Sequence, residues 1–242
     1  MRHKVISIIL ALIIIGGIGS ALNGGEDDKS TATTNTTNKD TSNTDSTKST
    51  GSTNTDTSKS EPVEKSERVV TGKATDLGAG TFTGGKDIPV GLYDATPVDG
   101  QGNFTVNSSD GSLKINEILG AANGMGVSKV RVEVVEGDKI QLQSINKAHF
   151  EPVTTPFVTK AQQLSLYSGV WKAGEDIAAG RYKAVPVNGS GNFVVYDKSN
   201  MPKVNEILGG DAGGVKEVTF DIKDGEIINI ASLNQVNITP VN

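Results

Sequence analysis

The stretch that decides the fold is GKDIPVGLYDATPVDGQGNFTV at residues 85–106, because it returns as GEDIAAGRYKAVPVNGSGNFVV at residues 174–195. Both belong to a longer repeat, in which residues 77–120 match residues 166–209 at a constant offset of 89. The pentapeptide NEILG closes both copies, and after it the offset becomes 88. Each copy has about 85 residues, enough for a small core of its own, so the repeat predicts tandem domains rather than a solenoid.

Apolar and polar residues alternate within each copy, as in strands with one buried face. The pattern is clear in VRVEV at 130–134 and in VTFDI at 218–222. Each run is followed by a turn, Glu136-Gly137-Asp138 or Asp224-Gly225-Glu226, and then by a second apolar run. Because Gly supplies the positive φ that tight turns need, we expect each turn to close a hairpin. The NEILG segments are too short to assign to a helix or a strand.

These patterns predict an all-β fold. We expect two tandem, small, antiparallel domains of the β-sandwich or jelly-roll kind, at residues 69–153 and 154–242. An N-terminal apolar helix and a disordered linker precede them.

The first 22 residues are an export signal or an anchor. Arg2, His3 and Lys4 precede an uncharged apolar run from Val5 to Leu22. Because positive residues stay on the cytoplasmic side, we expect the following chain to lie outside the cell. Residues 1–22 fit either a retained transmembrane anchor or a signal peptide that is cleaved after small residues. The protein is thus expected in the cell membrane with its C-terminal part outside, or secreted.

Residues 23–68 consist mainly of Ser, Thr, Asn, Asp and Lys, and Val63 is their only large aliphatic residue. Such a composition buries too little apolar area to offset its conformational entropy, so we expect a disordered linker.

Composition excludes several function classes for the 242-residue chain. Its formal charge of −5 argues against a nucleic-acid partner. The chain has no cysteine, which excludes disulfides, thiolate nucleophiles and a lipid-modified cysteine. His149 is the only histidine after residue 3, which is too few for a zinc site, and a lone histidine beside Phe150 near a strand end is more often structural or solvent-facing than catalytic. Residues 107–111 and 197–200 carry oxygen ligands but lack the order of a calcium loop. We therefore expect no metal, no cofactor and no catalytic residue.

Recurring carboxylates leave one enzymatic alternative open. Asp87 and Glu117 recur as Asp176 and Glu206, and glycoside hydrolysis needs two carboxylates about 5–10 Å apart. Residues that recur in both copies are more often required by the common fold, as is an Asp that accepts backbone N–H groups at a tight turn. The alternative function is therefore an envelope-acting hydrolase that uses these pairs.

Differences between the copies point to a ligand site. Gly78, Phe82, Leu92 and Asn107 of the first copy are replaced in the second by Tyr167, Trp171, Arg181 and Tyr196. Tyr, Trp and Arg dominate binding hot spots, and a residue gained in one copy is free of the demands of the common fold. If the chain has a ligand site, we expect it at these four residues. The competing interpretation is that Trp171 fills the core position of Phe82.

The set G-x-D-I-x-x-G-x-Y, P-V-x-G-x-G-N-F and N-E-I-L-G resembles an uncharacterised repeated extracellular domain of exported proteins of Gram-positive bacteria. The resemblance covers residues 77–153 and 166–240, and it implies location and architecture but no activity. This chain departs from that pattern by lacking an anchoring cysteine. Together these features predict a non-catalytic cell-surface or secreted module with a binding or structural role at the cell envelope. Its expected partners are the membrane, through the N-terminal segment, and a cell-wall glycan or another surface protein.

Overall fold

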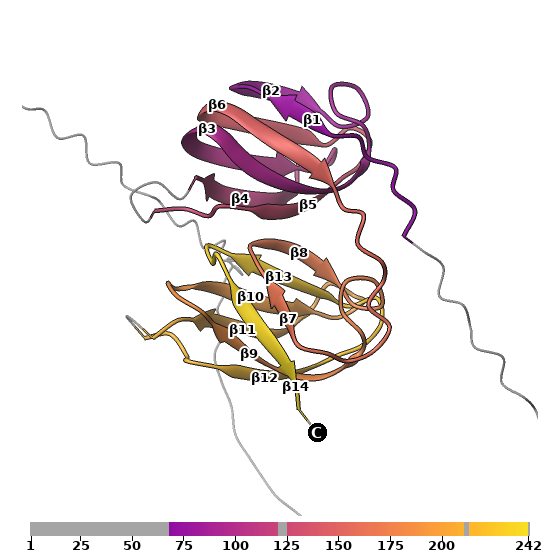
Figure 1. The fold of residues 1–242 in the computed structure, drawn as a ribbon, viewed down its shortest axis with the longest axis vertical. Coiled ribbons are helices and arrows are strands. Elements are labelled where there is room, and N and C mark those ends of the chain that lie inside the picture. Colours follow the sequence, from indigo (N-terminus) through magenta and orange to yellow (C-terminus); the bar gives the residue numbers. More distant parts are fainter. Residues whose placement is uncertain (1–67, 121–124, 211–212, 242) are drawn as a thin grey trace, which may run out of the picture. The chain divides into compact units, whose positions relative to one another are not determined.

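The structure is a computed structural model that describes residues 68–120, 125–210 and 213–241 (Figure 1). Every regular element in these residues is a strand, which confirms the all-β prediction. Among them there is no apolar helix of membrane-spanning length. The expectations for residues 1–22 and for the linker lie outside the described residues, except for Arg68 at the end of the linker.

The first copy contains six strands, of which two are long enough to pair with several neighbours. β3 lies antiparallel to β4, β5 and β6, and β6 also pairs with β1 and β2. The strands are β1 (Thr75–Leu77), β2 (Gly80–Thr83), β3 (Gly91–Asn107), β4 (Leu113–Leu119), β5 (Val130–Val134) and β6 (Lys139–Pro152).

The second copy repeats these pairings with its long strands divided. β9 and β10 replace β3, and β13 and β14 replace β6, so the strands fall into the groups β12-β9-β14-β7 and β8-β13-β10-β11. The strands are β7 (Leu164–Leu166), β8 (Gly169–Lys172), β9 (Gly180–Pro186), β10 (Gly191–Tyr196), β11 (Pro202–Leu208), β12 (Val218–Ile222), β13 (Ile227–Ala231) and β14 (Val236–Pro240).

The predicted hairpins are wrong. Among the described strands, β5 does not pair with β6 but with β3, and β12 and β13 belong to different sheets. The intervening turns therefore carry the chain between strand groups, although Gly137 and Gly225 have the expected positive φ of 81°. A buried carboxylate holds each turn: Asp138 accepts the Val135 N–H at 3.0 Å and the Lys114 ammonium at 2.7 Å. Glu226 does the same for Lys223 and Lys203 at 2.9 and 2.5 Å. Both NEILG segments are strand, in β4 and β11.

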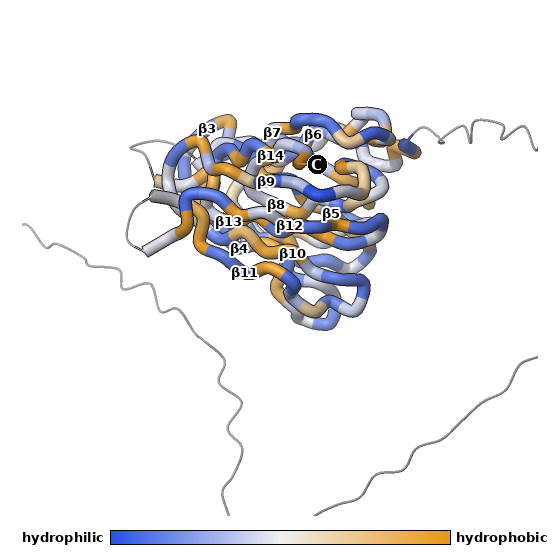
Figure 2. Tube along the Cα trace, turned by 90° about the horizontal axis from the view of Figure 1, so that it is seen from below, coloured by the Kyte–Doolittle hydropathy of each residue, from blue (hydrophilic) through white to orange (hydrophobic). Residues whose placement is uncertain are grey.

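Each copy has its own cluster of buried apolar side chains, and residues of alternating hydropathy follow one another along the strands (Figure 2). The repeated motif supplies both clusters with the same parts. Ile88 and Ile177 are fully buried. The buried Tyr93 and Tyr182 donate their hydroxyl hydrogen bonds to the carbonyls of Pro89 and Ala178, both at 2.8 Å. The bond uses a backbone carbonyl, which explains why the second copy needs no proline there.

The substitution Tyr182→Phe tests the role of this hydroxyl. It leaves the buried Ala178 carbonyl without its donor, so we expect the free energy of unfolding to fall by about 1–2 kcal/mol in chemical denaturation. The control is Tyr196→Phe, which alters a half-buried tyrosine outside the core and is expected to change stability by less than about 0.5 kcal/mol. Equal losses in the two variants would contradict this account of the motif.

Candidate functional site

The four residues predicted as a ligand site do not share one surface. Trp171 on β8 is only 5% exposed and belongs to the core cluster of the second copy. In the ladder from β8 through β13 to β10, Trp171 is in register with Ile228 and the buried Val195. Tyr196 follows Val195, so strand alternation places it on the opposite face from Trp171.

Arg181 lies in a different sheet from Trp171. It is exposed on β9 and pairs with Asp221 of β12 at 3.6 Å. Its neighbour Tyr182 is buried, as the alternation predicts. Only Tyr167 and Trp171 come together, with ring centroids 4.8 Å apart and planes at 76°. The prediction of one four-residue site is corrected accordingly: the strand faces separate its members.

A residue of the first copy covers this aromatic pair. The guanidinium of Arg131, on β5, stacks on the Trp171 ring at 3.9 Å from the centroid. It also donates a hydrogen bond to the Tyr167 hydroxyl at 3.1 Å. Burial raises the pKa of Tyr167, so this hydroxyl stays neutral at physiological pH. The two aromatic residues of the second copy thus bind an arginine side chain from the first copy of the same chain.

Two carboxylates neutralise the buried guanidinium, one from each copy. Asp94 of β3 accepts from Arg131 at 3.0 and 3.3 Å, and Asp176 of the second copy accepts at 3.1 Å. Burial alone would lower the pKa of Arg131, but Asp94, Tyr167 and Asp176 together outweigh this effect and the net shift is upward. We call Asp94, Arg131, Tyr167, Trp171 and Asp176 the Arg131 junction.

Backbone contacts reinforce the junction. The Arg131 N–H donates to the carbonyl of Ser168 at 2.9 Å, and the parallel pair Arg131 and Gly169 joins β5 to β8 in one ten-stranded sheet. A Cβ at Gly169 would lie 2.1 Å from the Arg131 carbonyl oxygen, so this position requires glycine. Val170 packs against the core cluster of the first copy.

Four of the five residues of the junction differ between the copies at equivalent positions, whereas Asp176 recurs as Asp87. Asp94 and Arg131 correspond to Lys183 and Thr219, and Trp171 corresponds to the half-buried Phe82. Residues gained by the second copy include Tyr167 and Trp171 but not Arg131. Arg131 is instead one of two charged residues gained by the first copy, and it lies directly opposite the other, Asp94, on the neighbouring strand.

Three of the four carboxylates proposed for hydrolysis have structural partners. Asp87 accepts the N–H of Thr83 at 2.8 Å, and Asp176 accepts the N–H of Lys172 at 2.9 Å in addition to its arginines. Glu117 accepts the N–H of Ser232, in the other copy, at 3.0 and 3.2 Å. These contacts hold turns and the boundary between the copies.

His149 serves to hold strands together. Its imidazole forms hydrogen bonds with Asp76 at 2.6 Å and with Glu151 at 2.9 Å. Both carboxylates raise the pKa of His149, and Asp76 has the larger effect. Asp76 and His149 are opposite each other on β1 and β6. Ser165 and Asn237 occupy the same positions in the second copy and bond at 2.8 Å. The recurrence of a polar pair without histidine indicates a role in strand pairing.

The two segments considered for calcium are turns that bind their own backbone. Asp110 accepts from the Ser108 hydroxyl and the Ser112 N–H, which lower its pKa to about 2. Asp197 accepts from the N–H groups of Ser199 and Met201. Within the described part of the chain, His, Asp and Glu residues form no group suited to a metal ion.

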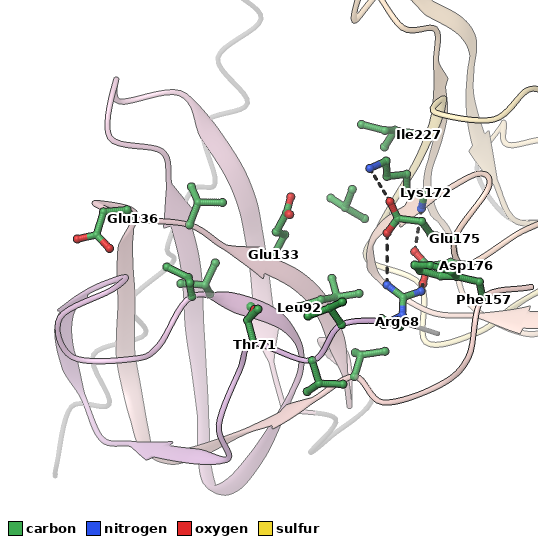
Figure 3. A pocket seen from close by; sticks show the side chains of 18 residues that line it. Arg68, Thr71, Leu92, Glu133, Glu136, Phe157, Lys172, Glu175, Asp176 and Ile227 are labelled. Carbon is green, nitrogen blue, oxygen red and sulfur yellow. Dashed lines mark hydrogen bonds and ion pairs between the residues drawn. The ribbon is translucent and has the colours of Figure 1, made fainter. Parts of the chain in front are cut away.

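A cavity of about 610 Å³ lies beside the junction (Figure 3). Apolar side chains form most of its wall, and charged side chains surround them. Arg68 bonds Asp176 at 2.7 Å and Glu175 at 3.5 Å, and Lys172 bonds Glu175 at 2.6 Å. The lining residues are Arg68, Val69, Val70, Thr71, Val90, Gly91, Leu92, Glu133, Val134, Val135, Glu136, Val153, Phe157, Val170, Lys172, Glu175, Asp176 and Ile227.

Comparison with protein-family models and with curated proteins finds no match to this chain. The resemblance to a repeated extracellular domain therefore remains a prediction.

The substitution Arg131→Ala tests the junction. It leaves the half-buried Asp94 without its ion pair and the buried Asp176 with Arg68 alone, and breaking a buried ion pair costs up to about 3–5 kcal/mol. We expect calorimetry to show a lower first unfolding transition. The control is Thr219→Ala at the equivalent position of the second copy, which should leave the transition within about 0.5 kcal/mol of the parent. An unchanged transition for Arg131→Ala would contradict the assigned role.

Glu117 predicts a pH dependence. Burial raises its pKa from 4.5 to about 7, against the opposing effect of the Ser232 N–H. As pH rises, the Glu117 carboxyl therefore loses its proton at a lower pH in the unfolded chain than in the folded chain. The free energy of unfolding should then fall by up to about 3 kcal/mol between about pH 4.5 and about pH 7. Glu117→Gln should remove that part of the slope in denaturation measured across this range, whereas Glu206→Gln, its counterpart, should not. Parallel slopes for Glu117→Gln and the parent chain would refute the assignment.

Proposed function

We propose that this chain is a non-catalytic binding module at the outer face of the cell envelope. Its head consists of two tandem β-sandwich domains, and residues 23–68 link the head to the apolar segment 1–22. That segment anchors the head in the membrane when it is retained, and the module is secreted when it is cleaved. The partner class is a cell-wall glycan or another surface protein.

The cavity beside the Arg131 junction is the observation that carries this proposal. Its volume of about 610 Å³ falls within the range of about 300–1,000 Å³ typical of ligand sites. Four of its valines, at 69, 70, 90 and 135, are between 36% and 82% exposed. Exposed apolar side chains gathered in one concave place mark binding surfaces.

The assignment as non-catalytic rests on what the recurring carboxylates do. Of Asp176 and Glu206, only Asp176 lines the cavity. Its carboxylate already accepts from Arg68, Arg131 and the Lys172 N–H. A general acid must carry a proton and a nucleophile must be free to attack, and two adjacent guanidinium groups oppose both roles. These contacts favour a binding module over the hydrolase.

Surface exposure tests the proposed location. The full chain with a C-terminal epitope tag is produced in a Gram-positive host, and intact cells are treated with a protease. We expect the tag to be lost without lysis, while a cytoplasmic reporter stays intact. The mass of the recovered chain then distinguishes a retained N-terminus from a cleaved one. Protection of the tag until lysis would overturn the proposed location.

A further inference from the structure

We propose that the cavity binds a short peptide segment in which one Lys or Arg side chain is flanked by small aliphatic residues. The inference rests on the proposed function, because it takes the head to be a binding module and names what the cavity recognises. Three observations carry it: the charge of the cavity, the chemistry of its wall and the comparison of the two copies.

The charge of the cavity is acidic and incompletely balanced. Four carboxylates line it against two cations. Arg68 and Lys172 are engaged by Asp176 and Glu175, whereas the carboxylates of Glu133 and Glu136 form no hydrogen bond or ion pair with the described residues. In Figure 3 no dashed line reaches either group. A cation placed beside Glu133 gains electrostatic complementarity, which Lys172 supplies only in part because it is bonded to Glu175.

The wall of the cavity favours aliphatic groups over sugar rings. Valine predominates in it, together with Leu92 and Ile227, and Phe157 is its one aromatic residue. The Phe157 ring already stacks on the Arg68 guanidinium at 4.9 Å. Recognition of a sugar relies on aromatic faces and many hydrogen-bond partners, whereas small aliphatic side chains match a valine surface by burial of apolar area.

The second copy lacks this combination at the equivalent positions. Leu92 and Val135 correspond to Arg181 and Lys223, and Glu133 and Glu136 correspond to Asp221 and Asp224. The acids are kept, but in the second copy cations stand where the first copy has apolar residues. The first copy thus combines an apolar wall with acids that form no ion pair with the described residues, and this combination is not required by the common fold.

Backbone groups around the cavity indicate how the peptide is held. The carbonyl of Glu133 accepts from Lys114, and the N–H groups of Val135 and Lys172 donate to Asp138 and Asp176. These three backbone groups are therefore not free to bond an added strand. Recognition proceeds through side chains, with the basic group beside Glu133 and the aliphatic groups on the wall.

The test uses the full chain in a nonionic detergent and a fluorescently labelled peptide, acetyl-Ala-Val-Lys-Val-Ala-amide, followed by fluorescence anisotropy. Capped ends leave Lys as the only charge. We expect binding that weakens with salt and is lost when Glu replaces Lys in the peptide. The double variant Glu133→Gln, Glu136→Gln should raise Kd by about tenfold. The matched control, Asp221→Asn with Asp224→Asn, removes the same charge outside the cavity and should leave Kd unchanged.

Both variants alter exposed side chains, so unchanged thermal midpoints are expected and keep the comparison interpretable. Equal affinity for the Lys and Glu peptides, or equal losses in the variant and its control, would overturn the inference. A parallel measurement with chitotetraose distinguishes failure of the peptide assignment from failure of the proposed surface-binding function. Binding of this oligosaccharide without the peptide would refute the peptide assignment and leave the surface-binding function standing, which the protease experiment tests independently.

Discussion

Burial of the Arg131 guanidinium is the constraint on which the arrangement of the two copies depends. A charge moved from water into a protein interior costs several kcal/mol unless carboxylates and further contacts compensate it. Asp94 supplies one carboxylate from the same copy, but Asp176, Tyr167 and the Trp171 ring come from the other. The compensation is complete only when the copies are in contact. The cavity lies beside this contact and shares Asp176 with it, so the geometry of the cavity depends on the same ion pairs.

Comparison of equivalent positions in the two copies separates residues that the common fold requires from residues that serve one copy alone. Positions that are equal in both copies, such as Tyr93 and Tyr182, make the same hydrogen bond in the same place. The contact between the copies combines positions that differ, such as Arg131, with positions that are equal, such as Asp176 and Gly169. The apolar wall of the cavity uses positions that differ, such as Leu92 and Val135. Trp171 is more buried than its counterpart Phe82 because Arg131 covers it, whereas no described residue plays that part for Phe82. The larger ring is thus an adaptation to a neighbouring copy.

The sequence sufficed for the repeat and the all-β class, because both can be recognised from local sequence patterns. It failed for the turns at Gly137 and Gly225, since a positive φ is compatible both with a hairpin and with a crossing between sheets. Comparison of the copies located Tyr167 and Trp171 but not their partner. Arg131 lies in an ordinary alternating strand, and only the three-dimensional register places it against Gly169. The cavity arises from segments far apart in sequence and has no local signature.

The central claim is that Arg131 holds the two copies as one unit, and a distance measurement tests it most directly. The chain has no cysteine, so Asn116→Cys and Asn205→Cys place spin labels only at these two exposed, equivalent strand positions, one in each copy. Pulsed electron–electron double resonance on the full chain should give one narrow distribution of the distance between the two spin labels. This distribution should broaden when Arg131→Ala is added. A broad distribution in the parent chain, or a narrow one that Arg131→Ala leaves unchanged, would contradict the account.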